Sequence, residues 1–162
     1  MRPQAFQRGS FTGLLHITAN HCNLTALPDA IGHLSTLRSL NVSSNELVAL
    51  PPSLGALARL ERLDVHRNRI AIVAAESVGG LVALARADLS SNCIQALPVR
   101  SLAKLEWLLD LDVSSNRLVE FPTHLGGCVR LQRLSLMGNV PRFDTNELAS
   151  LSKRRPDFVC LT

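Results

Sequence analysis

Apolar residues return along this chain at fixed places within a nine-residue segment. Leucine or another apolar residue fills the first, fourth and sixth places, and asparagine closes most copies at the ninth. Because strand side chains alternate between two faces, the apolar fourth and sixth places predict a short strand with one buried side. The clearest copies begin at Leu37, Leu60, Leu108 and Leu131 and read LRSLNVSSN, LERLDVHRN, LLDLDVSSN and LQRLSLMGN.

Six copies follow one another at intervals of 23 or 24 residues. No single copy can bury its apolar side alone, so neighbouring copies must stack and share one core. The pattern predicts six parallel strands in one curved sheet at residues 14–141, between an N-terminal extension at 1–13 and a C-terminal cap at 142–162. The copies begin at Leu14, Leu37, Leu60, Leu84, Leu108 and Leu131.

The closing asparagine of each copy lies where the chain turns off the predicted strand. Its amide can bond backbone groups of the turn and of the neighbouring copy, which would satisfy polar groups that stacking buries. In the first copy a cysteine fills this place. The predicted ladder consists of Cys22, Asn45, Asn68, Asn92, Asn116 and Asn139.

After the asparagine most copies continue as x-Leu-x-x-Leu-Pro, and the second reads LPPSLGALARLERL. This phrasing resembles the leucine-rich repeat, in particular the intracellular Ras-suppressor or scaffold type, over residues 14–139. The resemblance implies an α/β, right-handed leucine-rich-repeat solenoid with one curved parallel β-sheet and short turns or helical pieces on its convex side. It also implies protein binding through the concave face or the rims. The third and fourth copies depart from it, because each has one extra residue and Ala74 replaces a proline.

The two ends of the array differ in sequence. Residues 144–147 read DTNE, which predicts a capping box that opens a helical cap, and Pro156 would end that helix. A last short strand is expected between Phe158 and Leu161. Little apolar sequence precedes Leu14, so the first strand is expected to leave an open edge where a partner could dock.

Function is expected from side chains that point outward from the sheet. The third, fifth, seventh and eighth places of each copy are predicted to face the concave surface, where equivalent residues form columns about 4.8 Å apart. The residues expected to bind a partner are Arg62, Asp64, His66, Arg67, Arg86, Asp88, Asp110, Asp112, Arg133 and Trp107.

An acidic column is the sharpest feature of that surface. It contains Asp64, Asp88 and Asp112, and three like charges at strand spacing repel unless something neutralises them. In one interpretation they receive Arg or Lys from a partner. In the other, Arg62 and Arg86 pair with them on a solvated surface, which contributes little energy. A metal site is not predicted, because carboxylates along a flat row do not converge as a calcium or magnesium cage requires.

The only tryptophan, Trp107, directly precedes the fifth predicted strand. One hypothesis makes it an anchor for a partner on the rim, because tryptophan is enriched in binding hot spots. The alternative packs its ring beneath the turn between two repeats. The two hypotheses differ in how much of the ring solvent reaches.

The composition limits which cellular compartments and which classes of partner are expected. No apolar run approaches a bilayer span, so no membrane insertion is predicted. The formal net charge is +4, yet residues 11–141 carry eleven basic and ten acidic side chains, which is no large basic face for nucleic acid. The four cysteines form no CxxC spacing, which favours a reducing, intracellular compartment such as the cytoplasm. Arg2 and Arg8, with no acid in the first 28 residues, also resemble a mitochondrial presequence.

No arrangement of residues in the sequence indicates catalysis. The Ser-Ser pairs have His66 in an adjacent repeat but no strand-to-helix elbow or oxyanion loop, and the glycine pairs at 79–80 and 126–127 lack the lysine of a phosphate loop. The sequence predicts no enzyme, cofactor or metal site, and instead a protein-binding adaptor or structural subunit of a larger complex. Two alternatives stay open: a ribonucleoprotein or organellar assembly component whose basic termini touch RNA, and a protein regulator of an enzyme.

Overall fold

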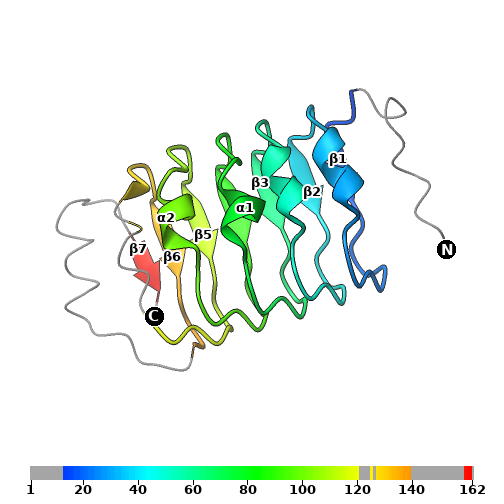
Figure 1. Ribbon diagram of the computed structural model, residues 1–162. Helices are drawn as coiled ribbons and strands as arrows, with labels where there is room; N and C mark the ends of the chain where they lie inside the picture. The colour runs from blue at the N-terminus through cyan, green and yellow to red at the C-terminus, as the bar shows by residue number, and fades with distance from the viewer. Residues whose placement is uncertain (1–12, 121–124, 126, 140–158, 162) are drawn as a thin grey trace.

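The computed structural model describes residues 13–120, 125, 127–139 and 159–161. Seven three-residue strands stand side by side in chain order, each parallel to the next, with β1 and β7 at opposite ends (Figure 1). They are β1 (His16–Thr18), β2 (Ser39–Asn41), β3 (Arg62–Asp64), β4 (Arg86–Asp88), β5 (Asp110–Asp112), β6 (Arg133–Ser135) and β7 (Val159–Leu161).

The six strands predicted from the apolar pattern are confirmed as β1 to β6. The last strand, β7, lies in the stretch where the sequence predicts a final short strand, and it pairs with β6. The predicted helical cap between residues 144 and 156 lies outside the described residues.

The second repeat shows how each copy builds the core. All of its predicted core positions are buried, with 3% or less of each side chain exposed. Fully burying a leucine contributes about 1.5–3 kcal/mol, so stacking rather than the three-residue strands stabilises the array. These core residues are Leu37, Leu40, Val42, Leu47, Leu50, Leu54 and Leu57.

The return segments on the side away from the strands differ with repeat length. The first two repeats have 23 residues and contain 3₁₀ helices, η1 (Asp29–His33) and η2 (Pro52–Ala56), whereas the two 24-residue repeats contain short α-helices, α1 (Ala75–Val78) and α2 (Val99–Leu102). An α-turn holds about 3.6 residues and a 3₁₀ turn about 3.0, so the wider turn absorbs the extra residue. The strands therefore stay in register across both repeat lengths.

Two glycines let neighbouring return segments approach closely. A Cβ atom on Gly55 would lie 2.1 Å from the Glu76 carbonyl oxygen, and one on Gly80 would lie 2.1 Å from the Gly55 carbonyl oxygen. Either contact is far shorter than atoms tolerate. The sequence places glycines in these return turns, and the structure shows that close backbone packing requires them there.

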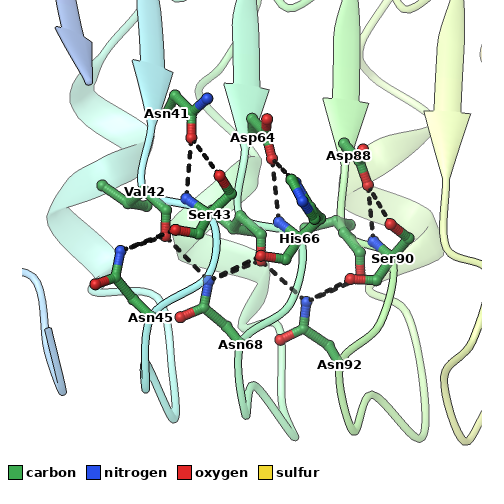
Figure 2. A network of polar contacts seen from close by, with 12 residues as sticks. Asn41, Val42, Ser43, Asn45, Asp64, His66, Asn68, Asp88, Ser90 and Asn92 are labelled. Atoms are coloured by element: carbon green, nitrogen blue, oxygen red, sulfur yellow. Dashed lines mark hydrogen bonds and ion pairs between the residues drawn. The ribbon is translucent and has the colours of Figure 1, made fainter. Parts of the chain in front are cut away.

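Each ladder asparagine joins its repeat to the one before it (Figure 2). Asn92 is typical, because its Oδ1 accepts a hydrogen bond from the Ile70 N–H at 3.0 Å and its Nδ2 donates to the carbonyls of Val65 and Leu89 at 3.1 and 3.0 Å. Only 8% of Asn92 is exposed. The same contacts recur at Asn45, Asn68, Asn116 and Asn139.

Cys22 occupies the ladder place of the first repeat but plays a smaller part. Its backbone N–H donates to Asn45 Oδ1 at 2.9 Å, while its thiol lies 3.2 Å from the Asn20 carbonyl of the same turn. The side chain is exposed. Cys22 therefore receives the ladder from the second repeat through its backbone and does not extend it through its side chain.

Candidate functional site

The strands place the predicted columns on one surface of the sheet. Register pairs Arg62 with Arg86, Arg86 with Asp110 and Asp110 with Arg133, so these third-place residues form one row. Two residues further along each strand, the fifth-place residues form a parallel row. In the centre of the sheet this second row contains Asp64, Asp88 and Asp112.

Each carboxylate of the acidic row bonds the turn that follows its own strand, as Figure 2 shows for Asp64 and Asp88. Asp88 Oδ1 accepts from the Ser90 N–H at 3.0 Å and from the Ser90 hydroxyl at 2.6 Å. Asp112 Oδ1 accepts from the Ser114 N–H at 2.8 Å. Because backbone N–H groups stabilise a carboxylate's charged form, this turn offsets part of the repulsion within the row.

Asp64 makes the same turn contact with a histidine. Its Oδ1 accepts from the His66 N–H at 3.2 Å and lies 2.7 Å from His66 Nδ1. In the second repeat Asn41 takes the acid's place, and its Oδ1 accepts from the N–H and the hydroxyl of Ser43 at 3.0 and 2.7 Å. An uncharged acceptor oxygen at the fifth place therefore makes the same bonds, and a charge is not required.

The seventh place differs from the sequence prediction in one repeat. Ser43 is only 3% exposed, because the chain bends back at the seventh place toward the fifth-place side chain, so this column is not uniformly outward-facing as predicted. The eighth place has left-handed backbone in five successive repeats, with φ between 52° and 54°. These residues are His21, Ser44, Arg67, Ser91 and Ser115.

The interpretation in which Arg62 and Arg86 neutralise the acidic column is wrong. Among the described residues neither arginine forms an ion pair, and the two lie directly opposite each other in register. Arg133 instead pairs with Asp110 at 3.0 Å within the third-place row. Both central arginines therefore keep their donors available for a partner.

A hollow of about 390 Å³ gathers most of the predicted binding residues. His66, Arg67 and Trp107 do not line it. Leu63 and Ala87 also line it, but their side chains are buried in the core, so strand backbone lies between the two charged rows. The predicted residues that line it are Arg62, Asp64, Arg86, Asp88, Asp110, Asp112 and Arg133.

One cluster in this region has donor atoms that a metal ion could use. Ligand atoms of Asp64, His66 and Asp88 all lie within 4.8 Å of one another, and each side chain is partly buried. The sequence does not indicate this grouping, because it depends on His66 bending back toward the acidic row. The contact between Asp64 and His66 already employs one oxygen and one ring nitrogen of the cluster.

Trp107 lies away from the charged rows, on the rim from which the strands start. More than half of it is exposed, at 54%, so the prediction that it packs beneath the inter-repeat turn is wrong. Its ring instead stacks with Arg130, whose guanidinium carbon is 3.9 Å from the ring centroid. The sequence signal that could have found this contact is the shared place of Trp107 and Arg130 in successive repeats.

Comparison with known proteins agrees with this architecture. The family described as Leucine rich repeat matches residues 35–92 and 58–118. A leucine-rich repeat protein of Leptospira interrogans has a similar solved structure, with a TM-score of 0.83 and 28% sequence identity over 92% of this chain. The chain spans 37% of the length of that structure. No curated protein sequence is significantly similar to this chain.

Two further findings concern how common this fold is and whether a described helix could cross a membrane. Matching solved chains number 422, so the fold is common and by itself names no partner. In the described parts of the chain, no helix is long and apolar enough to cross a bilayer.

Proposed function

The chain belongs to the leucine-rich repeat family, and from that membership we propose that it is a non-catalytic protein-binding module whose concave face receives the partner. Leucine-rich repeat proteins typically serve as interaction modules, which is the coarse function that this family membership supports. The proposal adds three statements to this coarse function. The concave face is the binding site, the protein is an adaptor or a structural subunit, and it works within a larger assembly.

The charged rows of the hollow carry the proposal. Arg62 and Arg86 hold positive charge on neighbouring strands without an ion-pair partner among the described residues. Beside them, Asp88 and Asp112 bond the turns through Oδ1 only, which leaves the second oxygen of each carboxylate available. A surface with both signs held in fixed positions selects a partner of complementary pattern.

The same rows favour protein over nucleic acid at this site. Phosphate recognition needs clustered cations, and three carboxylates beside two arginines would repel a nucleic-acid backbone. A protein segment can present acidic side chains to the arginine row and basic side chains to the aspartate row. The rows are two residues apart along each strand, or about 6.6 Å, which is also the spacing of alternate side chains in an extended peptide.

Neutralising the acidic row while keeping its turns tests the proposal. The variant Asp64→Asn, Asp88→Asn, Asp112→Asn retains the acceptor oxygen, and native Asn41 shows that an amide forms the same turn. Tagged wild-type and variant proteins would be used to recover partners from the native source at equal bait levels, with quantification by mass spectrometry. We expect recovery of the specific partner to fall at least tenfold while the melting temperature stays within a few degrees.

A matched control removes acids outside the concave face. The variant Glu76→Gln, Glu120→Gln changes two exposed residues that form no ion pair with any described residue, and it should recover the partner at wild-type strength. A folded triple variant that recovers every wild-type partner undiminished would place binding elsewhere. Failure of the wild-type protein to recover any stoichiometric protein would refute the interaction role itself.

A further inference from the structure

The rim beside Trp107 carries a second feature, separate from the concave face. Ala83, Trp107 and Arg130 each stand three residues before a strand, in three successive repeats whose strands pair in register. Trp107 therefore has the small Ala83 on one side and the long Arg130 on the other. Because Ala83 is small and Arg130 is long, the surface next to the Trp107 ring is hollow on the Ala83 side, and Arg130 stacks on the ring.

On the Ala83 side a hollow of about 400 Å³ opens next to the ring. We call it the rim hollow, and it is lined by Val82, Ala83, Lys104, Glu106 and Trp107. Ligand pockets for whole small molecules span about 300–1,000 Å³, so this volume is near the lower end and suits one large side chain with its flanking backbone.

The ring in the rim hollow is held ready for contact. The Arg130 guanidinium stacks on it at 3.9 Å, which restricts the rotamers of both side chains before any partner arrives. Restricting a tryptophan in advance lowers the entropy lost on binding. Val82, which also lines the rim hollow, is 52% exposed, so the aromatic surface continues into apolar surface on the Ala83 side.

The charges around the rim hollow are unequal. Lys104 and Arg130 contribute two positive charges and Glu106 one negative charge, and none of the three forms an ion pair among the described residues. A complementary ligand therefore brings an apolar group for the ring and a carboxylate for the cations. An embedded acid and only two cations make a poor site for a nucleic-acid backbone, which needs several phosphate contacts.

We propose that the rim hollow is a second docking site, which takes one bulky apolar side chain, flanked by acidic residues, from an extended segment of a partner protein. The apolar side chain enters between Trp107 and Val82 over Ala83, and a carboxylate next to it meets Lys104 or Arg130. Tryptophan and arginine are the residue types most enriched in binding hot spots. The site uses none of the residues assigned to the concave face.

The chain itself supplies the reporter for a test. It has one tryptophan and no tyrosine, so emission excited at about 295 nm comes from the rim hollow alone. The full chain would be titrated with three blocked peptides, GSDEXEDSG, in which X is Phe, Leu or Ile. We expect a saturable change of Trp107 emission with at least one peptide, at a Kd on the order of 0.1–1 mM for a single anchor.

Variants assign that signal to the rim hollow. Ala83→Leu fills the space beside the ring and should weaken binding at least tenfold, and Lys104→Glu should weaken it severalfold by reversing one charge. The concave variant Asp88→Asn, Asp112→Asn should bind the peptides as the wild type does. Peptides with Ala at X, or with Lys in place of the acids, should give no saturable change.

Three results would overturn the proposal. The first is the absence of a saturable change with all three peptides. The second is undiminished binding by both Ala83→Leu and Lys104→Glu, and using two variants keeps the test decisive if one fails to fold. The third is a saturable response to a twelve-residue oligouridylate but not to the peptides, which would make the rim hollow a base-stacking site.

Discussion

At the scale of single residues, the ladder asparagines hold the repeats together through at least three hydrogen bonds each. Asn116 accepts from the Ile94 N–H and donates to the carbonyls of Leu89, Val113 and Ser114, at 2.9–3.1 Å. Only 5% of Asn116 is exposed, so water cannot replace these bonds. One amide thus satisfies groups from two repeats that would otherwise be buried without partners.

Removing one ladder amide should destabilise the protein. Asn92→Ala or Asn116→Ala leaves a buried N–H and several carbonyls unpaired, which costs about 1–3 kcal/mol. Chemical denaturation would measure the change in the free energy of unfolding. Gln95→Ala, an exposed residue in the same region, is the control and should change stability by less than about 0.5 kcal/mol. Equal stability of all variants would contradict the ladder's role.

The cysteines should differ in reactivity. Burial raises the pKa of the Cys160 thiol to about 11, and Cys128 is fully buried, whereas Cys22 is exposed. Because the thiolate is the reactive form, Cys160 stays protonated and slow until the pH approaches 11. Iodoacetamide at pH 8 followed by peptide mass spectrometry should label Cys22 first. Faster labelling of Cys160 than of Cys22 in the folded protein would contradict its burial.

At the scale of elements, the return segments decide how closely the repeats stack. Gly80 and Gly55 meet backbone to backbone, and the Ser77 hydroxyl in α1 donates to the Leu50 carbonyl of the preceding repeat at 2.9 Å. Ser77 is completely buried. The side opposite the strands is therefore a packed layer in which an added methyl group at Gly55 or Gly80 has no room.

Adding that methyl group should be destabilising. Gly80→Ala and Gly55→Ala each force a carbon to 2.1 Å from a carbonyl oxygen, and overpacking of this kind costs about 1–3 kcal/mol or more. Gly79→Ala is the matched control one residue away, since its nearest contact is 3.0 Å, to the Ala75 oxygen one turn earlier. Thermal melting would rank the three variants. A Gly80→Ala protein as stable as the Gly79→Ala control would refute the close approach.

The apolar pattern of the sequence predicts the strands, their register and the core, because leucine spacing and strand alternation are local properties. The pattern cannot predict how the extra residue of the third and fourth repeats is accommodated. A repeat length of 24 does not say where the added residue lies. Prolines at the start of the return segment do not decide the helix type, because Pro51 precedes the 3₁₀ helix η2 whereas Pro98 precedes the α-helix α2.

The site is predicted less completely than the fold, for a different reason. The columns follow from alternation, but the bond of Asp88 to Ser90 and the left-handed backbone at Ser91 belong to the turn after the strand. The exposure of Trp107 depends on residues one repeat away, Ala83 and Arg130. The local apolar pattern does not predict the conformations of turns or the side-chain contacts between repeats.

At the scale of the whole molecule, each repeat contacts mainly its neighbours, so stability is expected to vary along the array. The Val65 and Leu89 N–H groups donate to strands that are themselves paired on both sides. The Ala19 N–H, directly after β1, donates to the Asn41 carbonyl of β2, and β1 itself pairs only with β2 among the described strands.

Hydrogen exchange should follow this position in the array. We expect the amides of Val65 and Leu89 to exchange at least tenfold more slowly than that of Ala19, after correction for intrinsic rates, because interior repeats open only with their neighbours. Two-dimensional NMR of the full chain in deuterated buffer would measure the rates. Equal protection at all three amides would mean that the described array opens as one cooperative unit.

Because the strand register is unbroken between 23- and 24-residue repeats, the number of repeats alone sets the length of the sheet. Each ladder amide reaches back by one repeat and no further, so an internal copy such as residues 60–83 could be duplicated or deleted without altering the bonding rule. Every such step would change the span by one strand, about 4.8 Å. The length of the sheet can therefore be changed in steps of one whole repeat.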